Sequence, residues 1–260
     1  MKLGSRSVPT HPERCRPWPV TPGARRIRPS WQSSLVKPFR ILTVCTANIC
    51  RSPMAAALLT VELTAAVENG TIAVASAGSN ALIGAPACPV MRDLAGATPL
   101  TEAQEPPGLP ESYRTHSARR LISEQLTQAD LILAMDRSHS GAIAQLAPAV
   151  RSKTFTLRQA ASLVTAVATA FASGELPVGA PPLPAKTDTS ARLQWVVGEL
   201  DAARGVTPML PDPEMLEQDT SPFDVADPHE IGTSYHPVAA RIIVSATKRI
   251  AEGLAVGMRA

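Results

Sequence analysis

A short stretch near residue 50 combines residue types that do chemistry on anions. It follows the apolar run 41–44 and precedes an alanine-rich pattern over 54–67 with helical spacing. A strand, a tight loop and a helix in this order direct backbone N–H groups and the helix N-terminus at one point, which suits a bound anion. The sequence therefore predicts a phosphate-binding loop made of Cys45, Thr46, Ala47, Asn48, Ile49, Cys50, Arg51 and Ser52.

Cys45 is the predicted nucleophile of this loop, because a helix N-terminus and a nearby guanidinium stabilise thiolate over thiol. Arg51 can bind two oxygens of a tetrahedral anion at once. Ser52 offers a hydroxyl to the sulfur, and Pro53 suits the first helical turn, where its missing N–H is not needed. The alternative is a buried structural cysteine beside a surface arginine, which leaves the surrounding strand, serine and helix unexplained.

The stretch resembles the phosphate loop of the low-molecular-weight protein tyrosine phosphatases, which reads Cys-x-x-Asn-x-Cys-Arg-Ser-Pro. Further landmarks follow in family order over about residues 39–160 and 222–256. They are Ser76-Ala77-Gly78, Gly84, Pro86, His116 to Arg119, Ala129 to Ile132, Met135 to Arg137, and Asp227-Pro228. The resemblance implies a phosphatase that hydrolyses phosphotyrosine, an aryl phosphate monoester, through a cysteinyl-phosphate intermediate and with no cofactor.

Asp227 is the predicted general acid, which protonates the leaving oxygen. The resemblance places this acid in an Asp-Pro pair before the last helix, where Asp227 and Pro228 stand. The proline biases Asp227 to an extended backbone, and the same carboxylate would later take a proton from the hydrolytic water. Asp224 is the local alternative, although an aspartate before a turn often serves only as a cap or turn former.

Three residues are expected to support the loop. Asn48 is predicted to hold strained loop backbone through side-chain hydrogen bonds, and the resemblance supplies Ser76 and His116 as its partners. Cys50 lies in the same tight loop as Cys45, so a reversible disulfide that protects the nucleophile is expected, as in the family. Inert packing is the alternative for Cys50.

The sequence predicts no metal site, because no second Cys/His pair stands at ligand spacing. His139 and His236 are interpreted as cap or surface residues. The chain also lacks the aromatic residues that the family usually places around a phenyl ring: those positions hold His229, Glu230, Asn80, Ala81 and Leu82. Because Thr46 is also small and polar, we expect weaker stacking on a phosphotyrosine ring than is usual in the family.

The periodicity predicts an α/β fold, a doubly wound four-stranded parallel sheet with helices on both faces and the phosphate-binding loop after its first strand. The expected strands cover residues 41–44, 71–75, 130–134 and 153–156. The expected helices cover residues 53–67, 91–95, 116–126, 138–146, 157–172, 190–200 and 235–256. Residues 98–110 are expected to form a loop.

Length and composition predict one domain over residues 39–260. Residues 1–38 are rich in proline and arginine, which predicts a disordered basic extension. Prolines also mark residues 173–222 as an insertion, either a mobile surface segment or a lid or partner-docking element. The formal net charge of +3 gives no reason to expect nucleic acid as a partner. Four cysteines without a regular framework and the lack of a membrane-length apolar run favour a cytoplasmic protein.

Two other functions use the same residues. A thiol-dependent arsenate reductase shares this fold and loop, but it relays a disulfide through further cysteines, and beyond the loop this chain offers only Cys88. A non-catalytic phosphate-binding interaction module is the second alternative, and an intact set of Cys45, Arg51, Ser52 and Asp227 argues against it. The expected partner is a phosphotyrosine protein, with a bacterial tyrosine kinase as one candidate, and the sequence leaves the oligomeric state open.

Overall fold

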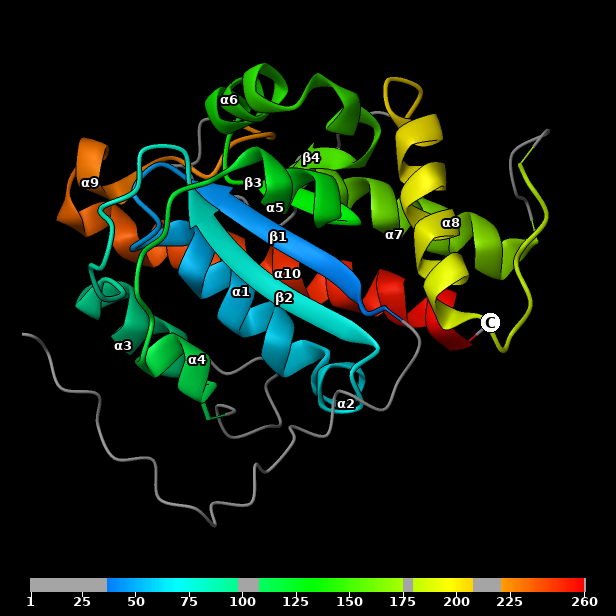
Figure 1. Ribbon diagram of the computed structural model, residues 1–260, viewed down its shortest axis with the longest axis horizontal. Helices are drawn as coiled ribbons and strands as arrows, with labels where there is room; N and C mark the ends of the chain where they lie inside the picture. Colours follow the sequence, from blue (N-terminus) through cyan, green and yellow to red (C-terminus); the bar gives the residue numbers. More distant parts are fainter. Residues whose placement is uncertain (1–36, 98–107, 175–179, 208–220, 260) are drawn as a thin grey trace, which may run out of the picture. The chain divides into compact units, whose positions relative to one another are not determined.

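Four parallel strands form the centre of the fold, and they confirm the predicted doubly wound sheet. They are β1 (Phe39–Cys45), β2 (Ile72–Gly78), β3 (Leu131–Ala134) and β4 (Thr154–Thr156). The order across the sheet is β2-β1-β3-β4, and all three pairings are parallel. The chain therefore leaves β1 between two neighbouring strands, and every strand ends at the same edge of the sheet (Figure 1).

The computed structural model describes residues 37–97, 108–174, 180–207 and 221–259. Almost all of the predicted extension over 1–38 and most of the predicted loop over 98–110 lie outside these ranges. The helices that the structure describes are α1 (Arg51–Glu62), α2 (Thr64–Glu68), α3 (Pro89–Ala97), α4 (Glu111–Arg114), α5 (Ser123–Gln128), α6 (Arg137–Leu146), α7 (Leu157–Ser173), α8 (Thr189–Ala203), α9 (Pro228–Ile231) and α10 (His236–Arg259), with 3-10 turns η2 (Pro148–Lys153) and η3 (Thr233–Tyr235). Among these, none combines the length and the apolar character needed to cross a bilayer.

Side chains of the strands alternate between two apolar cores, one on each face of the sheet. The larger core contains Phe39, Ile41, Leu131, Leu133 and Phe155 together with residues of α1, α7 and α10. The smaller core contains Leu42, Val44, Ile132 and Ala134 together with Leu126 of α5 and Ile143 of α6. Helix α10 passes behind the strands in the view of Figure 1 and packs on both α1 and α7.

Two predicted helices differ from the structure. The pattern over residues 53–67 forms two helices, α1 and α2, because the backbone turns at Leu63 between them. The helix predicted over residues 116–126 is wrong in its first part: residues 116–122 are not helical, α5 begins only at Ser123, and Arg120 forms a parallel bridge with Gly78. The reason is tertiary, since the backbone N–H of Arg119 and the ring of His116 both bond to Asn48.

Helix α8 belongs to the larger core, so a mobile surface segment is the wrong interpretation for this part of residues 173–222. Its buried apolar side chains are Leu193, Trp195, Val196, Val197 and Leu200. The helix packs against α7 and α10, and the indole nitrogen of Trp195 donates a hydrogen bond of 2.9 Å to Pro181 O. The lid interpretation does not fit α8 either, because α8 lies beside the C-terminal end of α10, far from α9 (Figure 1).

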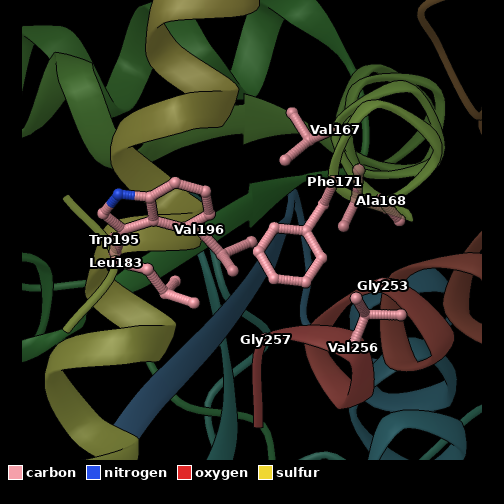
Figure 2. Close-up of a pocket in the computed structure, with 10 residues that line it drawn as sticks. Val167, Ala168, Phe171, Leu183, Trp195, Val196, Gly253, Val256 and Gly257 are labelled. Atoms are coloured by element: carbon pink, nitrogen blue, oxygen red, sulfur yellow. The ribbon is translucent and has the colours of Figure 1, made fainter. Parts of the chain in front are cut away.

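The junction of α7, α8 and α10 surrounds a small apolar pocket, which Figure 2 shows between Phe171 and Trp195. The two rings meet edge to face at 6.2 Å between centroids. Gly253 lets α10 approach α7 closely here, since a Cβ at this position would lie 2.1 Å from a methyl group of Val164. Val164 is buried and β-branched, so its side chain has little freedom to move aside.

We therefore expect Gly253→Ala to lower the free energy of unfolding by about 1–3 kcal/mol, because the added methyl overpacks the helix junction. Gly198→Ala is the matched control: it lies in α8 with no atom within 4 Å of an added Cβ. There the gain in helix propensity should raise stability by about 0.5–1 kcal/mol. Urea unfolding followed by circular dichroism measures both, and equal stabilities for the two variants would contradict the close packing.

Candidate active site

The loop between β1 and α1 is held in place by hydrogen bonds that other segments donate to its carbonyl groups. Those of residues 45–49 each accept a hydrogen bond from another segment, and the donors are Ser79 N, Asn80 N, Leu82 N, the His116 ring and Cys88 N. In a trans peptide the N–H points opposite to the C=O, so outward carbonyls leave the amides to face the centre of the loop. Together with the N-terminus of the 12-residue helix α1, they make an anion cradle.

Gly78 explains why the loop can lie so close to the end of β2. A Cβ at this position would lie 2.5 Å from Thr46 O and 3.0 Å from the Asn48 side chain. Any larger residue would push the loop away from the sheet. The Ser-Ala-Gly landmark in the sequence thus has a steric basis, because its glycine makes room for the loop backbone.

Asn48 adopts a left-handed backbone with φ of 58°, and no other non-glycine residue in the described ranges has a positive φ. Its side-chain amide donates to Ser52 Oγ at 3.0 Å and Ser76 Oγ at 2.9 Å, and its Oδ1 accepts from Arg119 N at 3.0 Å. The Nε2 of His116 donates to Asn48 O at 2.7 Å. These four contacts fix a conformation that an isolated loop would rarely adopt.

Cys45 is buried at the start of the loop, with 2% of the residue exposed. Its sulfur has two hydrogen-bond donors. It accepts a hydrogen bond of 3.0 Å from Ser52 Oγ and one of 3.3 Å from Asn48 N. Because Ser52 Oγ already accepts from Asn48, its own hydrogen is available to the sulfur. Two donors and the N-terminus of α1 therefore lie beside the sulfur.

Arg51 is buried and connects the loop to two carboxylates. Its Nη1 donates to Asp136 Oδ2 at 3.0 Å and Val225 O at 2.8 Å, and its Nη2 donates to Asp227 Oδ2 at 2.5 Å. The remaining nitrogen, Nε, is buried and has no hydrogen-bond partner in the part of the chain that the structure describes. This guanidinium therefore retains a donor for a further acceptor, such as an anion oxygen.

Asp136 and His139 belong to this site, although the sequence assigned no role to the first and only a cap or surface role to the second. Burial alone would raise the pKa of Asp136, but hydrogen bonds from His139 and Ser138 hold its pKa well below the usual value. His139 is buried, with Nδ1 2.9 Å from Asp136 Oδ1 and Nε2 2.9 Å from Thr46 Oγ1. One sequence signal could have identified Asp136, namely its position two residues after the end of β3. Parallel strands end at one edge of the sheet, so residues just beyond them lie near the phosphate loop.

The two candidate acids face different partners. Asp227 caps the N-terminus of α9 through His229 N and reaches Arg51 with its other oxygen. Asp224 instead binds Arg137, with contacts of 2.9 Å to its backbone N and 2.8 Å to its Nη2. Burial tends to raise the pKa of Asp224, but the Arg137 bonds lower it overall. Asp224 thus anchors residues 221–227, which we call the acid loop, and Asp227 lies at the phosphate loop.

An open hollow in front of the loop has a polar and acidic lining. The lining residues are Thr46, Arg51, Asp136, Arg137, Ser138, Asp224, Ala226, Asp227, Glu230 and Ile231. None of these is aromatic, which agrees with the replacement of the family's aromatic positions in the sequence. A substrate group that entered here would meet carboxylates, the guanidinium groups of Arg51 and Arg137, and one exposed apolar side chain, Ile231, which is 60% exposed.

A second group of reactive side chains lies behind the loop and was not anticipated from sequence spacing. Cys50, Cys88, His229 and His236 have ligand-type atoms that all lie within 4.8 Å of one another. Cys50, Cys88 and Cys45 are free thiols. Burial, followed by the neighbouring Cys88, Cys45 and Asp227, raises the pKa of Cys50 far above its usual value.

Comparison with known proteins identifies the family. The profile of the low molecular weight phosphotyrosine protein phosphatases matches residues 40–167. Wzb, a low molecular weight protein-tyrosine-phosphatase of Salmonella typhi, is 36% identical over 114 residues, which are 44% of this chain and 65% of Wzb. Its counterpart Etp of Escherichia coli K12 is 35% identical over 119 residues, 46% of this chain and 69% of Etp. A protein-arginine-phosphatase of Geobacillus stearothermophilus is 35% identical over 123 residues, 47% of this chain and 71% of that protein.

The matched region begins in β1 and includes the phosphate loop, the Ser-Ala-Gly turn and the segment of Asp136. The chain spans slightly less than two thirds of the length of Wzb, and more than two thirds of the length of Etp and of the arginine phosphatase. On this coverage and identity, the chain belongs to the low molecular weight phosphotyrosine protein phosphatase family.

Proposed function

We propose that this protein hydrolyses phosphotyrosine in proteins through a covalent phosphate on Cys45. The observation that carries the proposal is the meeting of three groups at one loop: Cys45 and Arg51 belong to the loop, and the Asp227 carboxylate, from a distant segment, bonds to Arg51. The names of Wzb and Etp support phosphotyrosine as the substrate class. The unpaired thiols of the described cysteines fit a reducing compartment, so we also propose a cytoplasmic location.

In the first step, the phosphate dianion occupies the cradle of amides and binds Arg51, whose Nε supplies a free donor. The Cys45 thiolate attacks phosphorus in line, so an S–P bond forms while the bond from phosphorus to the tyrosine oxygen breaks. Asp227 gives its proton to the departing oxygen. Asp136 keeps Arg51 in place throughout, because it accepts a hydrogen bond from Nη1 while Asp227 accepts one from Nη2.

In the second step, water hydrolyses the cysteinyl phosphate. Asp227, now ionised, takes a proton from the water as its oxygen bonds to phosphorus. The S–P bond breaks, and the returning negative charge on Cys45 is stabilised by the hydrogen bonds from Ser52 and Asn48. Inorganic phosphate leaves, and the enzyme regains its starting protonation.

A second candidate substrate is phosphoarginine. The hollow lacks an aromatic wall for a phenyl ring. Three of its carboxylates, Asp136, Asp224 and Asp227, are paired with Arg51 or Arg137, and the fourth, Glu230, would suit a cationic guanidinium. A relative at 35% identity is named a protein-arginine-phosphatase. We keep phosphotyrosine as the proposal, because the family description and the Wzb and Etp names agree on it.

The role of Asp227 as general acid can be tested separately from the role of Asp224, which anchors the acid loop. Cys45→Ser should reduce hydrolysis of p-nitrophenyl phosphate to background, and Asp227→Asn should lower kcat by about 100-fold or more. The loss in Asp227→Asn should be larger for phenyl phosphate, since a poorer leaving group needs the proton more. Asp224→Asn is the control and should lose less than about tenfold, with no dependence on the leaving group. Hydrolysis retained by Cys45→Ser would exclude the proposed nucleophile.

Asp136 is predicted to act as a positioning residue for Arg51. Asp136→Asn keeps an N-cap for α6 and removes only the charge, so kcat/KM should fall while the fold persists. Because the pKa of Asp136 is lower in the folded protein than in the unfolded chain, the carboxylate stabilises the fold above about pH 4 and less as the pH falls. The stability difference between wild type and variant should therefore shrink on acidification, as measured by urea unfolding at several pH values. A stability difference that stays constant with pH would contradict the lowered pKa of Asp136.

The substrate class is decided by comparing a phosphotyrosine peptide with a phosphoarginine peptide of the same sequence. We expect the higher kcat/KM for phosphotyrosine, because the family description and the names of Wzb and Etp agree on this substrate class. Malachite-green detection of released phosphate measures both reactions under the same conditions. A preference for phosphoarginine that Asp224→Asn or Glu230→Gln weakens would favour the second candidate instead.

A further inference from the structure

Four side chains that commonly bind metal ions meet behind the phosphate loop. Cys50 belongs to the loop itself, Cys88 precedes α3, His229 lies in α9, and His236 begins α10. Their ligand-type atoms all lie within 4.8 Å of one another. The sequence expectation of no metal site rested on spacing along the chain, and the fold brings these residues together from three separate segments.

The separations suit a tetrahedral ion. With metal–sulfur bonds of about 2.3 Å and metal–nitrogen bonds of about 2.0–2.1 Å, sulfur and nitrogen ligands lie about 3.6 Å apart. Cys88 Sγ lies 3.7 Å from His236 Nε2. The rings of His229 and His236 meet at 87° with centroids 5.0 Å apart, so they do not stack on each other. Small side-chain movements would bring all four ligands to bonding distance.

His236 is already oriented as a ligand. Its Nδ1 lies 2.8 Å from Thr233 O, and because a carbonyl oxygen can only accept, the hydrogen must be on Nδ1. In the neutral ring Nε2 then carries the lone pair, and Nε2 is the atom that faces Cys88. A hydrogen bond from the second ring nitrogen to a backbone carbonyl is the usual support of a metal-binding histidine.

We propose that Cys50, Cys88, His229 and His236 form a four-coordinate site for a thiophilic divalent cation, with zinc as the ion that fits two thiolates and two imidazoles best. On binding, the two thiols release their protons to solvent and the ion exchanges its water ligands for two sulfurs and two nitrogens. Four protein ligands leave no open position, so the site is structural or regulatory rather than catalytic.

The proposed metal ligands are close in sequence to residues of the active site. Cys50 directly precedes Arg51, and His229 follows Asp227 by two residues. A bound ion would therefore tie the phosphate loop to the acid loop and to the start of α10. His229 is exposed, so it provides the side from which an ion can enter, whereas the other three ligands are buried.

Cobalt(II) tests the site without relying on hydrolysis, so a failure would leave the proposed function unaffected. The full chain is reduced, freed of metal with a chelator and titrated with Co²⁺, and zinc is then added as a competitor. Wild type should bind one Co²⁺ per chain with the sulfur-to-cobalt charge-transfer and visible bands of a tetrahedral thiolate site, and zinc should abolish them. Its Tm should rise by several degrees with zinc, because only the folded chain presents all four ligands.

Four variants identify the ligands. Cys88→Ser and His229→Ala should weaken Co²⁺ binding at least about tenfold and remove the rise in Tm. Cys15→Ser removes a thiol but none of the proposed ligands, and Cys45→Ser removes the nucleophile; both should keep the cobalt spectrum. Cys88→Ser should also retain hydrolysis. The proposal is overturned if the reduced wild type shows no charge-transfer band, or if the spectrum is lost in Cys45→Ser and kept in Cys88→Ser.

Discussion

The loop that follows β1 depends on one backbone constraint, the left-handed conformation of Asn48. That conformation is unfavourable by itself for a residue with a side chain, and it persists because the amide group and the carbonyl of Asn48 are bonded to Ser52, Ser76, Arg119 and His116. With this residue fixed, the loop carbonyls point outward and its amides face one centre. The same hydrogen-bond chain passes through Ser52 to Cys45, so the shape of the loop and the placement of the sulfur have a common physical cause.

Arg51 is the second element on which the site depends. A buried guanidinium needs compensating charge, and Asp136 and Asp227 supply it from the ends of β3 and the acid loop. This pairing links three segments that are distant in the sequence. It also fixes the acid loop, since Val225 bonds to both Arg51 and Met135, the residue after β3. Asp224 adds a further anchor through Arg137, which leaves Asp227 as the carboxylate closest to the loop.

Helix α10 connects the rear of the active site to the core around α8. The long helix α10 begins beside the cysteine and histidine cluster and ends against α8, so one rigid element connects the rear of the site to the core that α8 enlarges. The close contacts at Gly253 and Gly257 require small residues there, because Val164 and Val196 fill the space opposite them. The core around α8 therefore stabilises α10, and α10 in turn presents His236 to Cys50 and Cys88.

The sequence by itself determined the strand–loop–helix unit, the doubly wound sheet and the family, because these follow from local patterns: an apolar run, a loop whose residue types bind anions, and helical spacing beyond it. Tertiary structure decided the rest. Residues 116–120 are not helical because Asn48 bonds to them, α8 is buried because α7 and α10 present apolar faces to it, and Asp136 and His139 reach the loop because parallel strands end at one edge. The cysteine and histidine cluster likewise had no signal in spacing, since its members meet only when three segments fold together.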